Sequence, residues 1–98
     1  MGDEPRCLRV RFQVYEEGKN WPRAYETARA LVEHDGAMYM DAYNFARIAG
    51  KLRKLQEAYN SIERAIDLAP DEAAANSVKT MALDNADFRE MWAHISEI

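Results

Sequence analysis

Between Tyr39 and Glu72, apolar residues recur every three or four positions, a spacing that places their side chains on one face of a helix. The pattern predicts two amphipathic helices, at about residues 38–50 and 54–68, joined by a short turn. Pro70 ends the second helix, because proline lacks the backbone N–H that a helix requires. The residues expected to face the core are Ala42, Phe45, Ala46 and Ala49 in the first helix and Leu55, Ala58, Ile62, Ala65 and Ile66 in the second.

The same pattern occurs 34 residues earlier, in the stretch that begins at Tyr15. A period of about 20–50 residues is typical of stacked helical arrays, in which one unit alone cannot bury its apolar face. An ordinary bundle of antiparallel helices would also have small residues where helices cross, but the helix-ending residues recur at the same offset, which favours a repeat. The matching pairs are Trp21 with Leu55, Ala24 with Ala58, Ala28 with Ile62, Leu31 with Ala65, and Gly36 with Pro70.

Residues 6–17 fit two interpretations. Leu8, Val10, Phe12 and Val14 alternate with polar residues, as in a half-buried strand, whereas Leu8, Phe12 and Tyr15 have helical spacing. A lone strand would leave its backbone groups unpaired, and the repeat places a helix here. We therefore predict a helix, and a strand that pairs across a dimer is the alternative.

Local signals predict where the other helices begin and end. Residues 1–4 form a short polar start. Asn20 is a good N-cap for a helix that runs to about His34, and Asp71 caps a helix over residues 72–83. Asp84 or Asn85 then caps the last helix. Its apolar stripe consists of Phe88, Met91, Trp92 and Ile95, at positions i, i+3, i+4 and i+7.

At these positions the chain resembles the tetratricopeptide repeat family. An apolar residue opens the second helix of each unit, a small residue lies on its inner face, and a helix stop follows. The turn glycine comes early, at Gly18, and the second unit has Gly50 but no glycine in its turn. The resemblance implies an all-α fold, a right-handed superhelical stack of antiparallel helix pairs with about six helices. It divides a single domain, residues 1–98, into units at about 5–38, 39–72 and 73–98.

The composition is that of a globular protein, with 48% hydrophobic and 31% charged residues. No apolar run approaches the ~18–20 residues that span a membrane. The opening residues also lack the basic-then-apolar pattern of a secretory signal. The single cysteine, Cys7, cannot form an internal disulfide, which fits a reducing compartment. We therefore expect a cytoplasmic protein.

The net charge of −4 is unevenly distributed along the chain. Residues 1–62 hold 10 Lys and Arg against 9 Asp and Glu, whereas residues 63–98 hold 3 against 8. Nucleic-acid binding requires a continuous basic surface, and the acidic C-terminal third argues against one. We expect neither nucleic acid nor a membrane as a partner.

Cys7, His34 and His94 are the residues best suited to nucleophilic or soft-metal chemistry. None has a base at a suitable spacing, and the chain lacks the HExxH, CxxC and glycine-rich motifs that bind zinc or phosphate. We therefore predict a protein that is not an enzyme and that uses no cofactor or metal.

In tetratricopeptide repeats, the first helix of each pair lines a concave face along which peptides lie. Carried over by alignment, this implies a binding face on the helices at 6–17 and 38–51. Arg47 and Lys51 are four residues apart and so share a face, and Arg9 should approach them from the neighbouring helix. Such a basic strip suits an extended acidic segment, although a merely solvated face would give the same pattern. The expected binding residues are Arg6, Arg9, Gln13, Met40, Tyr43, Asn44, Arg47 and Lys51.

Two functions from different classes follow. The first is an interaction module that binds a protein or peptide segment on the concave face. The second is a structural unit that self-associates as a homodimer, because about three repeats are the minimum that such arrays need for stability.

Overall fold

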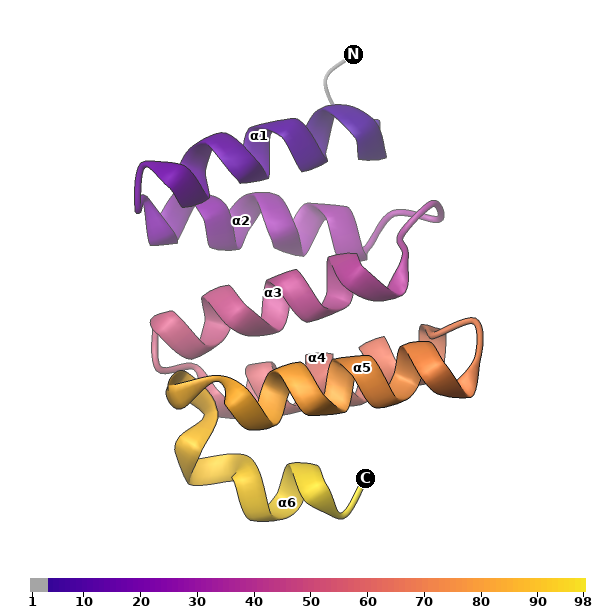
Figure 1. The fold of residues 1–98 in the computed structure, drawn as a ribbon. Helices are drawn as coiled ribbons and strands as arrows, with labels where there is room; N and C mark the ends of the chain where they lie inside the picture. Colours follow the sequence, from indigo (N-terminus) through magenta and orange to yellow (C-terminus); the bar gives the residue numbers. More distant parts are fainter. Residues whose placement is uncertain (1–3) are drawn as a thin grey trace.

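The computed structural model describes residues 4–98, which form six α-helices and one 3₁₀ helix (Figure 1). No strand occurs among these residues, and neighbouring helices pack against one another along the chain. The prediction of an all-α fold is therefore confirmed. Residues 1–3, which belong to the predicted polar start and to the predicted 1–98 domain, lie outside the described residues. The elements are α1 (Pro5–Glu17), α2 (Trp21–Val32), α3 (Tyr39–Lys51), α4 (Leu55–Leu68), α5 (Glu72–Asp84), η1 (Ala86–Met91) and α6 (Trp92–Ser96).

The segment with two interpretations is helix α1, so the prediction of a helix is confirmed and the strand alternative is wrong. Proline at its first position suits a helix start, since proline has no N–H to satisfy there. Leu8 and Phe12, one turn apart, are buried. The residues that gave the alternating pattern, Val10 and Val14, are each 59% exposed. The helical spacing, and not the alternating pattern, therefore describes which residues of this segment are buried.

The turns between helices repeat with the 34-residue period of the sequence. After α1, three backbone N–H groups donate to carbonyls of the last helical turn, namely Gly18 to Val14 (3.1 Å), Lys19 to Glu16 (3.0 Å) and Asn20 to Tyr15 (2.9 Å). After α3, Leu52, Arg53 and Lys54 donate in the same order to Ile48 (3.1 Å), Gly50 (3.1 Å) and Ala49 (2.8 Å). Lys19 and Arg53 both have positive φ, at 56° and 61°. The two helix pairs thus share one turn geometry.

The core lies where small side chains let helices approach closely. Ala24, Ala46, Ala49, Ala58 and Ala65 are all 0% exposed. Helix α3 lies in the middle of the stack in Figure 1, and its contacts with α4 are the most extensive between any two elements. Because α1, α2, α4 and η1 surround it, α3 is buried on most of its circumference, far beyond the single face that the sequence predicts.

Side-chain caps fix two of the predicted helix starts. The Asn20 side chain accepts from the N–H of Arg23 (3.4 Å), and Asp71 accepts from Ala74 (2.8 Å). Helix α2 ends at Val32, slightly before the predicted His34. Among the helices of residues 4–98, none is long and apolar enough to cross a bilayer.

The C-terminal segment differs from the predicted single helix. The Asn85 side chain accepts from the N–H of Asp87 (2.9 Å) and starts η1, and only from Trp92 onward does the chain become α-helical. The apolar stripe is nevertheless buried, with Phe88 and Ile95 at 0% exposure. The indole N–H of Trp92 donates to the carbonyls of Ala82 (3.1 Å) and Asn85 (3.2 Å), which ties the shortened α6 to the end of α5.

Candidate functional site

A hollow of about 400 Å³ lies between α1 and α3. Its apolar floor includes Phe12 from α1 and Leu31 from α2, which are 5% and 3% exposed. We call this hollow the α1–α3 groove. The residues that line it are Arg9, Phe12, Gln13, Glu16, Leu31, Met38, Met40, Asp41 and Asn44.

The structure brings four of the expected binding residues together in this groove. Gln13 from α1 and Asn44 from α3 line it with Arg9 and Met40. The other four do not line it, namely Arg6, Tyr43, Arg47 and Lys51. The groove therefore contains four of the eight expected binding residues.

Arg9 forms a bidentate ion pair with Asp41 across the groove. Its Nε donates to Oδ1 (2.9 Å) and its Nη2 to Oδ2 (2.7 Å), and Nη2 also donates to the carbonyl of Gly36 (3.2 Å). The hydrogen bonds to Asp41 raise the pKa of the Arg9 guanidinium, while burial opposes the shift. The Asp41 carboxylate is buried and also accepts from the N–H of Met38 (2.8 Å), at the start of α3. Arg9 thus fixes how α1 sits on the start of α3.

Arg47 forms a second link between the same two helices. Its guanidinium donates to both carboxylate oxygens of Glu16 and to the side-chain oxygen of Asn44 (2.9 Å from Nη2). Both members of the ion pair are 29% exposed. Arg47 therefore links α3 to α1, and it engages the oxygen of the Asn44 amide, which leaves the NH₂ group of that amide without a partner among residues 4–98.

Tyr43, expected on the binding face, is instead buried at 3% exposure. Its ring packs edge-on against Phe88, with the centroids 6.4 Å apart. Burial raises the pKa of the Tyr43 phenol, while a hydrogen bond with Asn85 and the charge of Arg47 oppose that shift. Because the C-terminal segment covers this side of α3, Tyr43 belongs to the core.

The remaining expected cations also have acidic neighbours. The ammonium of Lys51 lies 2.9 Å from Asp87, and the guanidinium of Arg6 lies 3.8 Å from Glu4. With Arg9 and Arg47 also paired, the basic residues do not form the uncompensated positive strip that the sequence predicts. Of the charged side chains that line the groove, Arg9 is basic and Asp41 and Glu16 are acidic. Each of them is paired, Arg9 with Asp41 and Glu16 with Arg47.

The groove retains neutral groups that are exposed to solvent. The Gln13 amide is exposed and makes no hydrogen bond within residues 4–98, and Met38 is 54% exposed beside the half-buried Met40. Carboxamides both donate and accept, which suits the N–H and C=O groups of an extended chain. Methionines adapt to side chains of varied shape. The site is thus chemically a neutral groove with an apolar floor and two amides.

Sequence reasoning missed the roles of Asp41 and Glu16 as partners of the basic residues. A signal existed for Glu16. At the 34-residue offset Arg47 is the counterpart of Gln13, and Glu16 lies one helical turn after Gln13 on α1. Asp41 stands three residues after Met38, where an acid often caps a helix start. Its pairing with Arg9 depends on how two helices sit together and has no local signal.

Within residues 4–98, no cluster of three or more His, Cys, Asp or Glu side chains has a geometry that would hold a metal ion. Comparison with family models, with curated proteins and with solved structures finds no match to this chain.

Proposed function

We propose that this chain is a protein–protein interaction module of the tetratricopeptide type, which binds an extended protein segment in the α1–α3 groove. The observation that carries the proposal is the groove itself, with its apolar floor, the amide of Gln13 that is unpaired among the described residues, and the NH₂ group of Asn44. Apolar side chains of the segment would contact Phe12 and the methionines, and its backbone would hydrogen-bond to the amides.

The tetratricopeptide assignment is supported by the repeated turns. The matching hydrogen bonds after α1 and α3 show that the sequence period is also a period of backbone geometry. The groove lies between the first helices of the first two units, where the resemblance implies a ligand should lie. The ion pairs of Arg9 and Arg47 support a neutral rather than an acidic segment, because both cations already have anionic partners.

The test uses peptides selected from a random display library against the whole chain. Affinity is then measured for a groove variant, Gln13→Ala with Met40→Ala, and for a control variant, Glu26→Ala with Asn76→Ala, at exposed positions of α2 and α5. We expect the groove variant to lose about tenfold in affinity, or ~1.4 kcal/mol, and the control to lose nothing measurable. Equal affinity for both variants would contradict the proposal.

A self-associating structural unit is the second candidate, and one observation favours it. Val10 and Val14, one turn apart on α1, are each 59% exposed, so they form an apolar strip with no partner among residues 4–98. Light scattering over a range of concentrations tests this alternative. A dimer that disappears in Val10→Lys with Val14→Lys would support self-association, and a monomer at every concentration would exclude it.

A further inference from the structure

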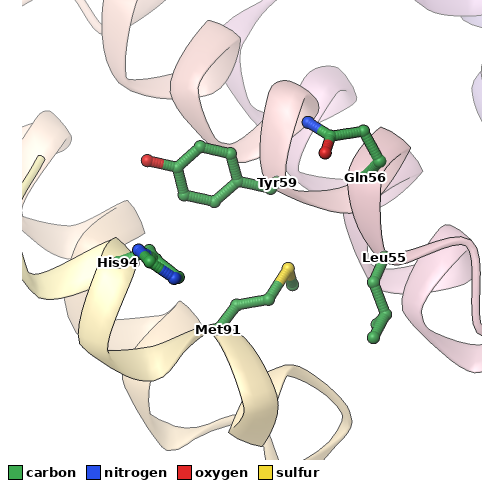
Figure 2. Close-up of a pocket in the computed structure, with 5 residues that line it drawn as sticks. All are labelled: Leu55, Gln56, Tyr59, Met91 and His94. Atoms are coloured by element: carbon green, nitrogen blue, oxygen red, sulfur yellow. The ribbon is translucent and has the colours of Figure 1, made fainter.

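A second hollow, of about 280 Å³, lies between α4 and the C-terminal segment, away from the α1–α3 groove. It is lined by Leu55, Gln56 and Tyr59 from α4, Met91 from η1 and His94 from α6. Figure 2 shows Leu55 and Met91 at one end and Tyr59 and His94 at the other, with the Tyr59 ring and His94 on opposite sides of the space. The ring centroids of Tyr59 and His94 are 6.4 Å apart, and the two ring planes are nearly perpendicular. The hollow thus presents aromatic and thioether surface.

The preceding unit shows what fills the equivalent place. Tyr25 is the counterpart of Tyr59 at the 34-residue offset. The Tyr25 ring packs against Phe45, with centroids 5.2 Å apart, and its hydroxyl donates to Glu57. In the next unit the counterpart of Phe45 is Lys79 and that of Glu57 is Met91. The aromatic ring and the hydrogen-bond acceptor that contact Tyr25 are therefore both replaced at the corresponding sequence positions.

Two acidic residues follow Tyr59 and His94 in the sequence, outside the lining of the hollow. Glu63 follows Tyr59 by one helical turn on α4, and Glu97 follows His94 by three residues at the end of α6. Leu55 lies near Met91 and Tyr59 lies near His94, so the two segments run in the same direction (Figure 2). Because residues three or four positions apart share a face of a helix, we expect both carboxylates beyond the same end of the hollow. Both residues are exposed, and neither has an ion pair within residues 4–98. They are part of the chain's acidic C-terminal third.

We infer that this hollow is a second docking site, for a partner protein segment that carries an aromatic residue next to a lysine or arginine. The aromatic ring takes the place that Phe45 takes against Tyr25, in contact with Tyr59, Met91 and Leu55. The adjacent cation lies near Glu63 and Glu97, where two like charges without partners attract it. This inference is independent of the α1–α3 groove.

The test is an NMR titration of the ¹⁵N-labelled whole chain with three capped dipeptides, acetyl-Phe-Arg-amide, acetyl-Phe-Glu-amide and acetyl-Ala-Arg-amide. We expect Phe-Arg to shift the amides of Gln56, Tyr59 and His94 in a saturable way at millimolar concentration. We expect Phe-Glu to bind about threefold more weakly or worse, since exposed charge pairs contribute little each. The Ala-Arg probe should give no saturable shift. Equal binding of all three, or shifts that lie elsewhere, would overturn the inference.

Two variants separate the parts of the site. Glu63→Gln with Glu97→Gln should abolish the preference for Phe-Arg over Phe-Glu, whereas Glu17→Gln with Glu26→Gln, at exposed positions of α1 and α2, should leave it unchanged. Tyr59→Leu should weaken both phenylalanine probes together. A preference that survives in the Glu63 and Glu97 variant would overturn the role of these two carboxylates. Because the α1–α3 groove is not involved, failure here would leave the peptide-selection result unaffected.

Discussion

Gly50 shows how a single residue sets the distance between elements. A Cβ atom at this position would lie 2.8 Å from Cε1 of Phe88, closer than real Cβ atoms approach other atoms. Phe88 is 0% exposed and packs edge-on against Tyr43, which lies on α3 together with Gly50, so its ring has little room to move away. The absence of a side chain at Gly50 therefore lets the C-terminal segment cover α3.

Gly50→Ala should lower the free energy of unfolding by about 1–3 kcal/mol, because overpacking in the core outweighs the preference of helices for alanine. The control is Gly18→Ala, where a Cβ would make only ordinary contacts, 3.6 Å from the nearest atom. Chemical denaturation measures both variants. A Gly50→Ala protein as stable as the parent would mean that Phe88 does not pack as described.

Tyr25 gives the structure a defined response to alkaline pH. Its hydrogen bond to Glu57 is the main cause that raises the pKa of the phenol, with burial next and the charge of Arg29 opposing. The Lys54 ammonium also lies 5.3 Å from the centre of the ring. Because the folded pKa lies above the unfolded value of about 10, the stabilisation is complete below pH 10 and disappears as the pH rises through the folded pKa.

We expect the free energy of unfolding to fall more steeply above about pH 10 in the parent than in Tyr25→Phe, which has no phenol to ionise there. Urea titrations at pH 8, 10 and 11 measure the difference. The same slope in both proteins would show that Tyr25 ionises equally easily in the folded and unfolded chains.

At the level of elements, the turns after α1 and α3 are the clearest repeated structure. Lys19 and Arg53 occupy the same left-handed conformation, which costs an L-residue about 1 kcal/mol or more. Glycine adopts this conformation without strain, although it loses more entropy on folding. The family resemblance placed a glycine near this point, at Gly18, one residue before the position that has positive φ.

Lys19→Gly and Arg53→Gly should each raise the free energy of unfolding by about 0.5 kcal/mol, and the effects should add because, within residues 4–98, the two side chains share no hydrogen bond or ion pair. Lys79→Gly, inside α5, is the matched control and should cost about 1 kcal/mol. Thermal denaturation of the single and double variants gives the comparison. Destabilisation by both turn variants would argue against the shared turn geometry.

The C-terminal segment shows a limit of element prediction. Phe88 and Met91 are three residues apart, a spacing that fits a 3₁₀ helix as well as an α-helix. The sequence therefore identified the residues that are buried but not the helix type. What decides the type is the Asn85 cap and the close packing of Phe88 on Gly50, neither of which leaves a periodic signal.

At the scale of the molecule, the period of the sequence predicted the stacking of α1 to α4. The apolar spacing and the helix-ending residues on which that prediction depends are both local features of the sequence. The groove was predicted only in part. Gln13 and Met40 lie where the alignment implied, but Tyr43 is buried because the C-terminal segment covers it. The charges of Arg9 and Arg47 are compensated by residues more than 30 positions away, and such pairing depends on how helices sit together.

The proposed function requires that a protein segment binds between α1 and α3. The most direct measurement is the NMR footprint of a display-selected peptide on the ¹⁵N-labelled whole chain, recorded for the parent and for Gln13→Ala with Met40→Ala. We predict shifts centred on Gln13, Met40 and Asn44, which weaken in the variant. A footprint on Val10 and Val14, or one that the variant leaves unchanged, would contradict the claim.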